Sequence, residues 1–112
     1  MAQTLIVADK TITLDKEGYL EHLSDWNEEV AHALARQHDL ELTDAHWEII
    51  NLMRDFHRRR GISPIMRILV KLVEVELGPE KGNSLYLLKL FPGSPARVAS
   101  KIAGLPRPHN CI

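Results

Sequence analysis

Hydrophobic residues follow two different spacings along the chain, and the change between them predicts a small hairpin followed by helices. Leu5 and Val7 lie two residues apart, and residues 11–14 (Thr-Ile-Thr-Leu) are β-branched and aliphatic. With residues 8–10 between them, these runs predict a β-hairpin. Residues 15–18 (Asp-Lys-Glu-Gly) then predict a turn. Because an isolated hairpin is marginally stable in water, we expect it to pack against the segments that follow.

After Gly18 the apolar spacing lengthens to about 3.6 residues and predicts five helical segments. The first begins after an N-cap at Ser24 or Asp25. Its stripe consists of Trp26, Val30, Ala33, Leu34 and Gln37. The second opens at residues 43–44 (Thr-Asp) and ends at Gly61. Its inward residues are Ile49, Leu52, Met53 and Phe56, and the two tryptophans, Trp26 and Trp47, are expected in the core.

Proline and glycine mark the ends of the remaining three segments. Ser63 followed by Pro64 predicts the start of the third helix, and Gly78 its end. Asn83 or Ser84 caps a short fourth helix that continues through Leu85, Leu88 and Phe91. The fifth helix runs from Ser94-Pro95 to Gly104. Its stripe is Val98, Ala99, Ile102 and Ala103, and that of the third is Ile65, Ile68, Leu69, Leu72 and Val73.

The predicted fold class is therefore mostly α (α+β), an orthogonal bundle of about five helices with a small N-terminal β-hairpin. Residues 1–104 form this domain. The last eight residues are different, because Pro106 and Pro108 cannot be helical and push the residues before them toward extended geometry. Residues 105–112 are predicted to form a flexible, polyproline-like arm that leaves the bundle at Gly104 and could extend about 25 Å.

Cys111 stands near the end of this polar arm and is the only cysteine. Buried cysteines normally lie on apolar faces, whereas a thiol on an arm could enter another protein's active site and carry sulfur or electrons. The thiolate is the nucleophile, and Arg107 or His109 could favour it while the carboxylate of Ile112 opposes it. The alternative is a loose tail with an incidental cysteine, and spacing alone does not decide between the two.

Composition limits the classes of function and location that the chain could have. The chain has 112 residues, 45% hydrophobic and 26% charged, with a net charge of -1, so it fits one globular domain and gives no general argument for nucleic-acid or membrane binding. We expect a cytoplasmic protein, because no secretory signal or membrane-length apolar run is visible and a lone thiol suits a reducing compartment. The six histidines show no ligand pair, and no phosphate loop is present, so we expect no metal and no cofactor.

A basic run closes the second helix: Arg54, His57 and the consecutive arginines Arg58, Arg59 and Arg60. Followed by the helix start at Ser63, it resembles a helix-turn-helix, which predicts a nucleic-acid-binding regulator. The competing interpretation, which we favour, is a solvated last turn whose cations complement the helix dipole. Whether this run touches RNA or DNA is open from the sequence.

The tail resembles a known family. Residues 101–112 (Lys-Ile-Ala-Gly-Leu-Pro-Arg-Pro-His-Asn-Cys-Ile) closely resemble the C-terminus of the DsrC/TusE family. Residues 17–20, 42–50, 80–86 and 90–93 agree, so the likeness covers nearly the whole chain. It implies a helical domain with an N-terminal hairpin and a mobile arm, with Cys111 as the catalytic residue.

One departure separates the branches of that family. The DsrC branch, which partners dissimilatory sulfite reductase, has a second cysteine where this chain has Ser100. A serine cannot form the intramolecular sulfur bridge, so the sulfite reductase gamma-subunit-like role becomes an alternative. The resemblance instead implies a TusE-like sulfurtransferase, which accepts persulfide sulfur from a TusBCD-type complex. It passes that sulfur to a MnmA-type thiouridylase with its tRNA, for 2-thiolation of the wobble uridine.

Overall fold

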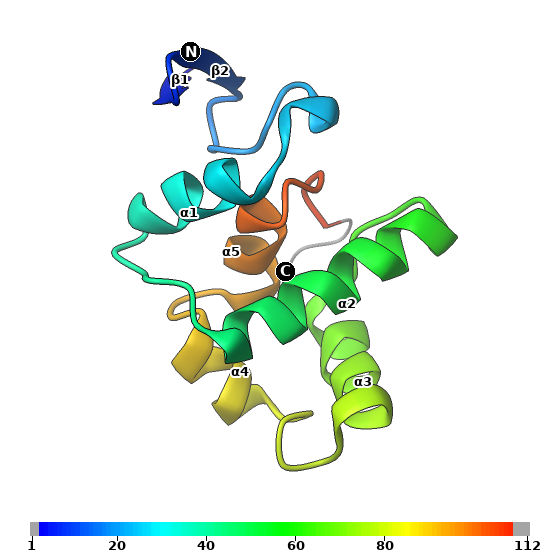
Figure 1. Cartoon of the computed structure of the whole chain (residues 1–112). Coiled ribbons are helices and arrows are strands. Elements are labelled where there is room, and N and C mark those ends of the chain that lie inside the picture. Colours follow the sequence, from blue (N-terminus) through cyan, green and yellow to red (C-terminus); the bar gives the residue numbers. More distant parts are fainter. Residues whose placement is uncertain (1–2, 109–112) are drawn as a thin grey trace.

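The computed structural model describes residues 3–108, which contain a two-stranded hairpin, one short 3-10 helix and five α-helices (Figure 1). The predicted fold class is confirmed. In chain order the elements are β1 (Gln3–Val7), β2 (Lys10–Leu14), η1 (Leu23–Asp25), α1 (Glu28–Arg36), α2 (Asp44–Arg60), α3 (Met66–Leu77), α4 (Ser84–Leu90) and α5 (Pro95–Ile102).

The hairpin closes through a two-residue turn. Val7 pairs with Lys10, and the intervening Ala8 and Asp9 both have positive φ, 49° and 65°, as a tight turn between twisted strands requires. Ile12 is fully buried, because alternate residues of β2 face the helices. Contacts between β1 and α1 attach the hairpin to the bundle, as expected for a unit that is marginal alone.

Helix α5 is the centre of the bundle. It contacts α1, α2, α3 and α4, and six of its eight residues are buried (Figure 1). Its predicted stripe is correct, since Ala99, Ile102 and Ala103 have no exposed surface and Val98 is 7% exposed. Because α5 ends inside the bundle, the segment that follows it begins among core residues rather than at the surface.

Two of the predicted helix starts are wrong. Helix α1 begins at Glu28 with Asn27 as its cap, so Trp26 precedes the helix, and neither Ser24 nor Asp25 caps it. Helix α3 begins at Met66 with Ile65 at the cap position, because the Ser63 hydroxyl bonds elsewhere. At α1, Ser24 and Asp25 belong to the 3-10 helix η1 instead, and at α3 a tertiary contact of Ser63 outcompetes the local start signal.

The buried face of α4 also differs from the predicted one. Leu85 and Leu88 are 64% and 43% exposed, whereas Leu87 and Phe91 are fully buried. The cap itself was predicted correctly, since the Asn83 side chain accepts a hydrogen bond from the Tyr86 amide. In a helix of seven residues, the elements that pack against it decide which face is buried.

Candidate functional site: the root of the cysteine arm

The sequence predicts that residues 105–112 carry the reactive thiol, and the structure describes residues 105–108 of this segment. The catalytic candidate Cys111, with His109 and Ile112, lies outside the described residues. The structure does place the start of this segment, the arm root, which we define as residues 104–108. It fixes where the thiol-bearing segment starts and which side chains surround that start.

The arm root begins with a sharp turn that ends α5. The Leu105 amide donates to the Ser100 carbonyl over 2.9 Å, and the Gly104 amide donates to the Lys101 carbonyl over 3.0 Å. With Gly104 at φ +71°, this pair of bonds is the Schellman ending of a helix. The turn satisfies the last carbonyls of α5 and sends the chain off in a defined direction.

Two side chains from elsewhere in the chain bind the next two carbonyls, those of Ile102 and Ala103. The Trp26 indole Nε1 donates to the Ile102 carbonyl over 2.9 Å, and Arg54 Nη1 donates to the Ala103 carbonyl over 2.7 Å. The Arg54 guanidinium also lies 3.7 Å from the Trp26 ring centroid, a cation–π contact. The pKa of Arg54 is lowered, chiefly by burial and secondly by Arg58. An arginine nonetheless remains charged at neutral pH, so these bonds persist.

Beyond the turn, the arm root stays on the bundle. Leu105 is 3% exposed and joins the core, and Pro108 is buried. The Ser63 hydroxyl donates to the Pro106 carbonyl over 2.5 Å. Arg107 Nη1 lies 2.8 and 2.9 Å from the two carboxylate oxygens of Glu17. Residues 105–108 are not helical, as the prolines predict, but the prediction that the chain leaves the bundle at Gly104 does not hold for these residues.

The Glu17 carboxylate is presented by a well-ordered turn. One oxygen of Asp15 accepts from the Glu17 and Tyr19 amides over 2.9 and 3.0 Å, and the Gly18 amide donates to the Asp15 carbonyl. This self-bonding turn explains how a loop residue can pin the arm root. Since Glu17 and Arg107 are about half exposed, their ion pair positions the chain more than it stabilises the fold.

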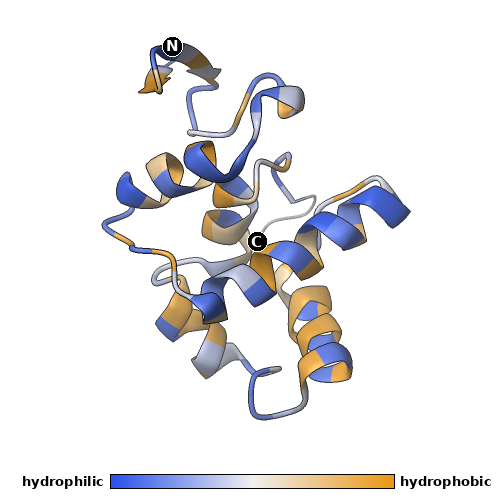
Figure 2. Ribbon diagram, in the orientation of Figure 1, coloured by the Kyte–Doolittle hydropathy of each residue, from blue (hydrophilic) through white to orange (hydrophobic). Residues whose placement is uncertain are grey.

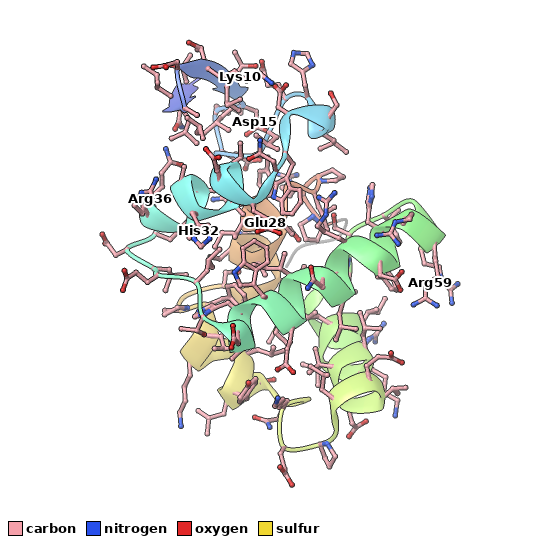
Figure 3. All side chains as sticks on the ribbon, viewed as in Figure 1. Lys10, Asp15, Glu28, His32, Arg36 and Arg59 are labelled. Atoms are coloured by element: carbon pink, nitrogen blue, oxygen red, sulfur yellow. The ribbon has the colours of Figure 1, made fainter. Side chains whose placement is uncertain are left out.

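A small hollow of about 180 Å³ lies beside the arm root. It is lined by Leu23, Arg54, His57, Arg58, Gly104 and Leu105. The end of α2 that supplies its cations is strongly hydrophilic, and Arg59 points away from the body of the molecule (Figures 2 and 3). Arg58 and Arg59 lie 3.1 and 2.9 Å from the Asp55 carboxylate. These pairs agree with the favoured interpretation of the run as a solvated helix end.

Ser100 is fully buried in α5, and its Oγ has no hydrogen-bond partner within residues 3–108. The position at which the resemblance sets two branches apart is thus enclosed in the core. In the same part of the chain, no group of three His, Cys, Asp or Glu residues is arranged to hold a metal ion.

Sequence reasoning singled out Cys111, which lies outside the described residues, and Arg107, but it missed the residues that hold the arm root: Glu17, Trp26, Arg54 and Ser63. Trp26 was expected in the core, Arg54 in the basic run, and Ser63 at a helix cap. The one usable signal was that Arg54 directly follows the buried Met53 of α2 and is itself only partly exposed. Even that signal does not identify the carbonyl it binds, which lies on another helix.

A family model described as "DsrC like protein" matches residues 6–112. The chain belongs to the DsrC-like family. It is 50% identical over 101 residues to the sulfurtransferase TusE homolog of Haemophilus influenzae, covering 90% of this chain and 93% of that protein. It is 47% identical over 108 residues to sulfurtransferase TusE of Photorhabdus laumondii, covering 96% and 97%.

Solved structures of the family share the fold. The NMR structure of Allochromatium vinosum DsrC superposes with a TM-score of 0.90 at 48% identity, covering all of both chains. The oxidised gamma-subunit of the dissimilatory sulfite reductase (DsrC) from Archaeoglobus fulgidus gives 0.86 at 42% identity, covering 98% of this chain and all of that one. The predicted family is confirmed, and so is the predicted class, a sulfurtransferase that carries sulfur. Within residues 3–108, no helix is both long and apolar enough to cross a membrane.

Proposed function

We propose that this protein carries sulfur as a persulfide on Cys111. In this proposal, Cys111 accepts sulfur from a TusBCD-type donor complex and delivers it to a MnmA-type tRNA thiouridylase for 2-thiolation of wobble uridine. The relatives named sulfurtransferase TusE support the relay, and Ser100 supports the single-cysteine form of it. The donor, the acceptor and the cytoplasmic location stay predictions.

The chemistry needs one thiol and no cofactor. The Cys111 thiolate attacks the outer sulfur of the donor's persulfide, a new S–S bond forms, and the donor's S–S bond breaks. The donor cysteine leaves as a thiolate, so no net oxidation occurs and no oxidant is required. An acceptor thiolate then attacks the outer sulfur of the Cys111 persulfide in the same way. With no second cysteine in the chain, no internal thiol can discharge the persulfide as a disulfide.

The observation that carries the proposal is the anchoring of the arm root next to the only sulfur nucleophile. Residues 104–108 are held by Trp26, Arg54, Ser63 and Glu17, and Cys111 follows Pro108 by three residues. Three residues span at most about 10 Å, so the thiol stays near this start point. We infer a division of labour in which residues 1–104 recognise partners and residues 105–112 deliver the sulfur.

A sulfite reductase subunit remains the second candidate, because the gamma-subunit of Archaeoglobus fulgidus shares the fold. Ser100 argues against it, since that role relies on a second cysteine at this position. The helix-turn-helix alternative has weaker support. Two of its arginines are already paired with Asp55, and Arg54 is engaged with Trp26 and Ala103.

Intact-mass measurement after incubation with a persulfide-loaded donor tests the function. The parent protein should gain one sulfur atom, which a reductant removes, and Cys111→Ser should gain none. Equal loading of the Cys111→Ser variant would exclude Cys111 as the carrier. In cells lacking this protein, wobble-uridine 2-thiolation should fall and be restored by the parent but not by Cys111→Ser. Restoration by the variant would exclude the tRNA role.

A further inference from the structure

We propose that the surface around the arm root is the docking site of the protein that donates persulfide sulfur, and that it recognises an apolar side chain flanked by carboxylates. We call this surface the docking face and define it by Leu23, His57, Arg58, Arg60 and Ile62. The inference rests on the proposed function, because it concerns the partner that loads Cys111.

The length of chain beyond the arm root limits where a donor can sit. Pro108 is the last described residue, and it is buried against the bundle. Cys111 can therefore lie no more than about 10 Å from Pro108. A donor persulfide must approach within bonding distance of that thiol, so part of the donor's surface must cover the neighbourhood of the arm root.

Two exposed apolar side chains lie at the arm root on separate elements. Leu23 is 40% exposed and lines the small hollow together with Leu105. Ile62 is 41% exposed and directly precedes Ser63, whose hydroxyl bonds to Pro106. Large exposed apolar residues close to a functional segment are typical of protein-binding surfaces. An apolar side chain of the partner could enter the hollow of about 180 Å³ that Leu23 and Leu105 line.

The α2 side of the docking face carries an excess of positive charge. Arg54, Arg58, Arg59 and Arg60 lie within its last two turns, where Asp55 is the acidic residue. Asp55 pairs with two of them, and Arg60 has no carboxylate partner within residues 3–108. The whole chain has a net charge of -1, so this excess is local. Charge complementarity therefore favours a partner with carboxylates facing the end of α2.

The apolar component favours a protein over a nucleic acid. Phosphate-binding surfaces combine cations with polar groups or stacking aromatics, whereas this face combines cations with two exposed aliphatic side chains. A larger hollow, of about 850 Å³, is lined from α3, the start of α4 and the start of α5 and by none of residues 104–108. Its lining therefore gives no link to the arm root.

The test compares two sources of sulfur in the full-length protein. The variants are the double substitution Arg60→Glu/Ile62→Ser on the docking face and the control Arg36→Glu/Val75→Ser, whose residues are exposed on α1 and α3. Loading of Cys111 is followed by mass spectrometry, with either a persulfide-loaded TusBCD-type complex or glutathione persulfide as donor. Binding of tRNA is measured in parallel.

We expect the docking-face variant to load about tenfold more slowly from the protein donor and at the parental rate from glutathione persulfide. The control should match the parent with both. Parental loading of the docking-face variant from the protein donor would overturn the inference, as would equal slowing of the control. Unchanged loading with weakened tRNA binding would assign the face to nucleic acid instead. Failure of the parent to load from either source would instead contradict the proposed function.

Discussion

The ring of Trp26 fills the space that any side chain at Gly104 would need. A Cβ at Gly104 would lie closer to Cδ1 of that ring than van der Waals contact allows. Gly104 also has φ +71°, a conformation that disfavours other residues. Two independent constraints thus require glycine where α5 turns into the arm root, and one of them comes from a residue far away in the sequence.

Replacement of Gly104 by alanine should lower the free energy of unfolding by about 2 kcal/mol or more, since strain at positive φ adds to overlap with Trp26. Gly61→Ala is the matched control, because Gly61 has φ +76° and open space around it. It should show the strain alone, about 1 kcal/mol. Urea unfolding of both variants measures the difference. Equal losses would mean that Trp26 does not crowd Gly104.

Truncation of Arg54 should destabilise the protein more than truncation of its neighbours. Arg54→Ala leaves the Ala103 carbonyl without this donor and removes the contact with Trp26, which together cost about 2 kcal/mol. Arg59→Ala removes an exposed ion pair and should cost less than about 0.5 kcal/mol. Thermal unfolding of the two variants provides the measurement. A loss as small for Arg54→Ala as for Arg59→Ala would contradict the described contacts.

The two buried serines should respond in opposite directions to alanine. The Ser63 hydroxyl donates to Pro106, so Ser63→Ala should lower the free energy of unfolding by about 1 kcal/mol. Ser100 Oγ is unpaired among the described residues, so Ser100→Ala should raise it by up to about 1 kcal/mol. Chemical denaturation of both variants tests the pair. Destabilisation by Ser100→Ala would indicate an unrecognised partner for that hydroxyl.

Loss of the Glu17–Arg107 ion pair should change sulfur transfer more than stability. Both side chains are about half exposed, so Arg107→Gln should alter the free energy of unfolding by less than about 1 kcal/mol. Because the pair fixes the arm root, the same variant should change the rate of loading of Cys111 from a protein donor. The charge swap Glu17→Arg/Arg107→Glu should bring the rate back toward that of the parent. No recovery in the swap would show that the pair does not position the arm.

Stability should fall on acidification partly because of His38. Its pKa lies below 6.5, chiefly because burial disfavours the charged imidazole and also because Lys101 repels it, with Asp39 acting in the opposite direction. The unfolded chain therefore binds the proton more tightly, and the free energy of unfolding decreases as pH falls from 6.5 toward the lower pKa of the folded state.

His38→Gln removes the difference in proton binding at this position between the folded and the unfolded chain. Between about pH 7.5 and about pH 5.5, its urea midpoint should fall less than that of the parent. His22→Gln, at an exposed position, is the control and should follow the parent. A parallel fall in His38→Gln and the parent would exclude His38 as a source of acid sensitivity.

Local patterns predicted most of the fold correctly. Ile49, Met53, Leu69 and Val73 are fully buried as their spacing indicated, and Gly61 and Gly78 end their helices. Helix periodicity and the helix-ending conformation that glycine adopts both depend on residues that are close in sequence. Local patterns therefore predict these features. The errors occurred at Trp26, Ser63 and the inward face of α4. The Trp26 and Ser63 side chains form hydrogen bonds with distant parts of the chain, and α4 packs against α5.

The sequence by itself determined the order of elements, the exclusion of helix at the C-terminal prolines and the presence of a single thiol. Those properties follow from residue types and from intervals of a few residues. Only the tertiary structure decided where that thiol's segment starts, because Glu17, Trp26, Arg54 and Ser63 reach the arm root from four different parts of the chain. Their hydrogen bonds act across space on backbone carbonyls and on Arg107, and local sequence patterns do not indicate such pairings.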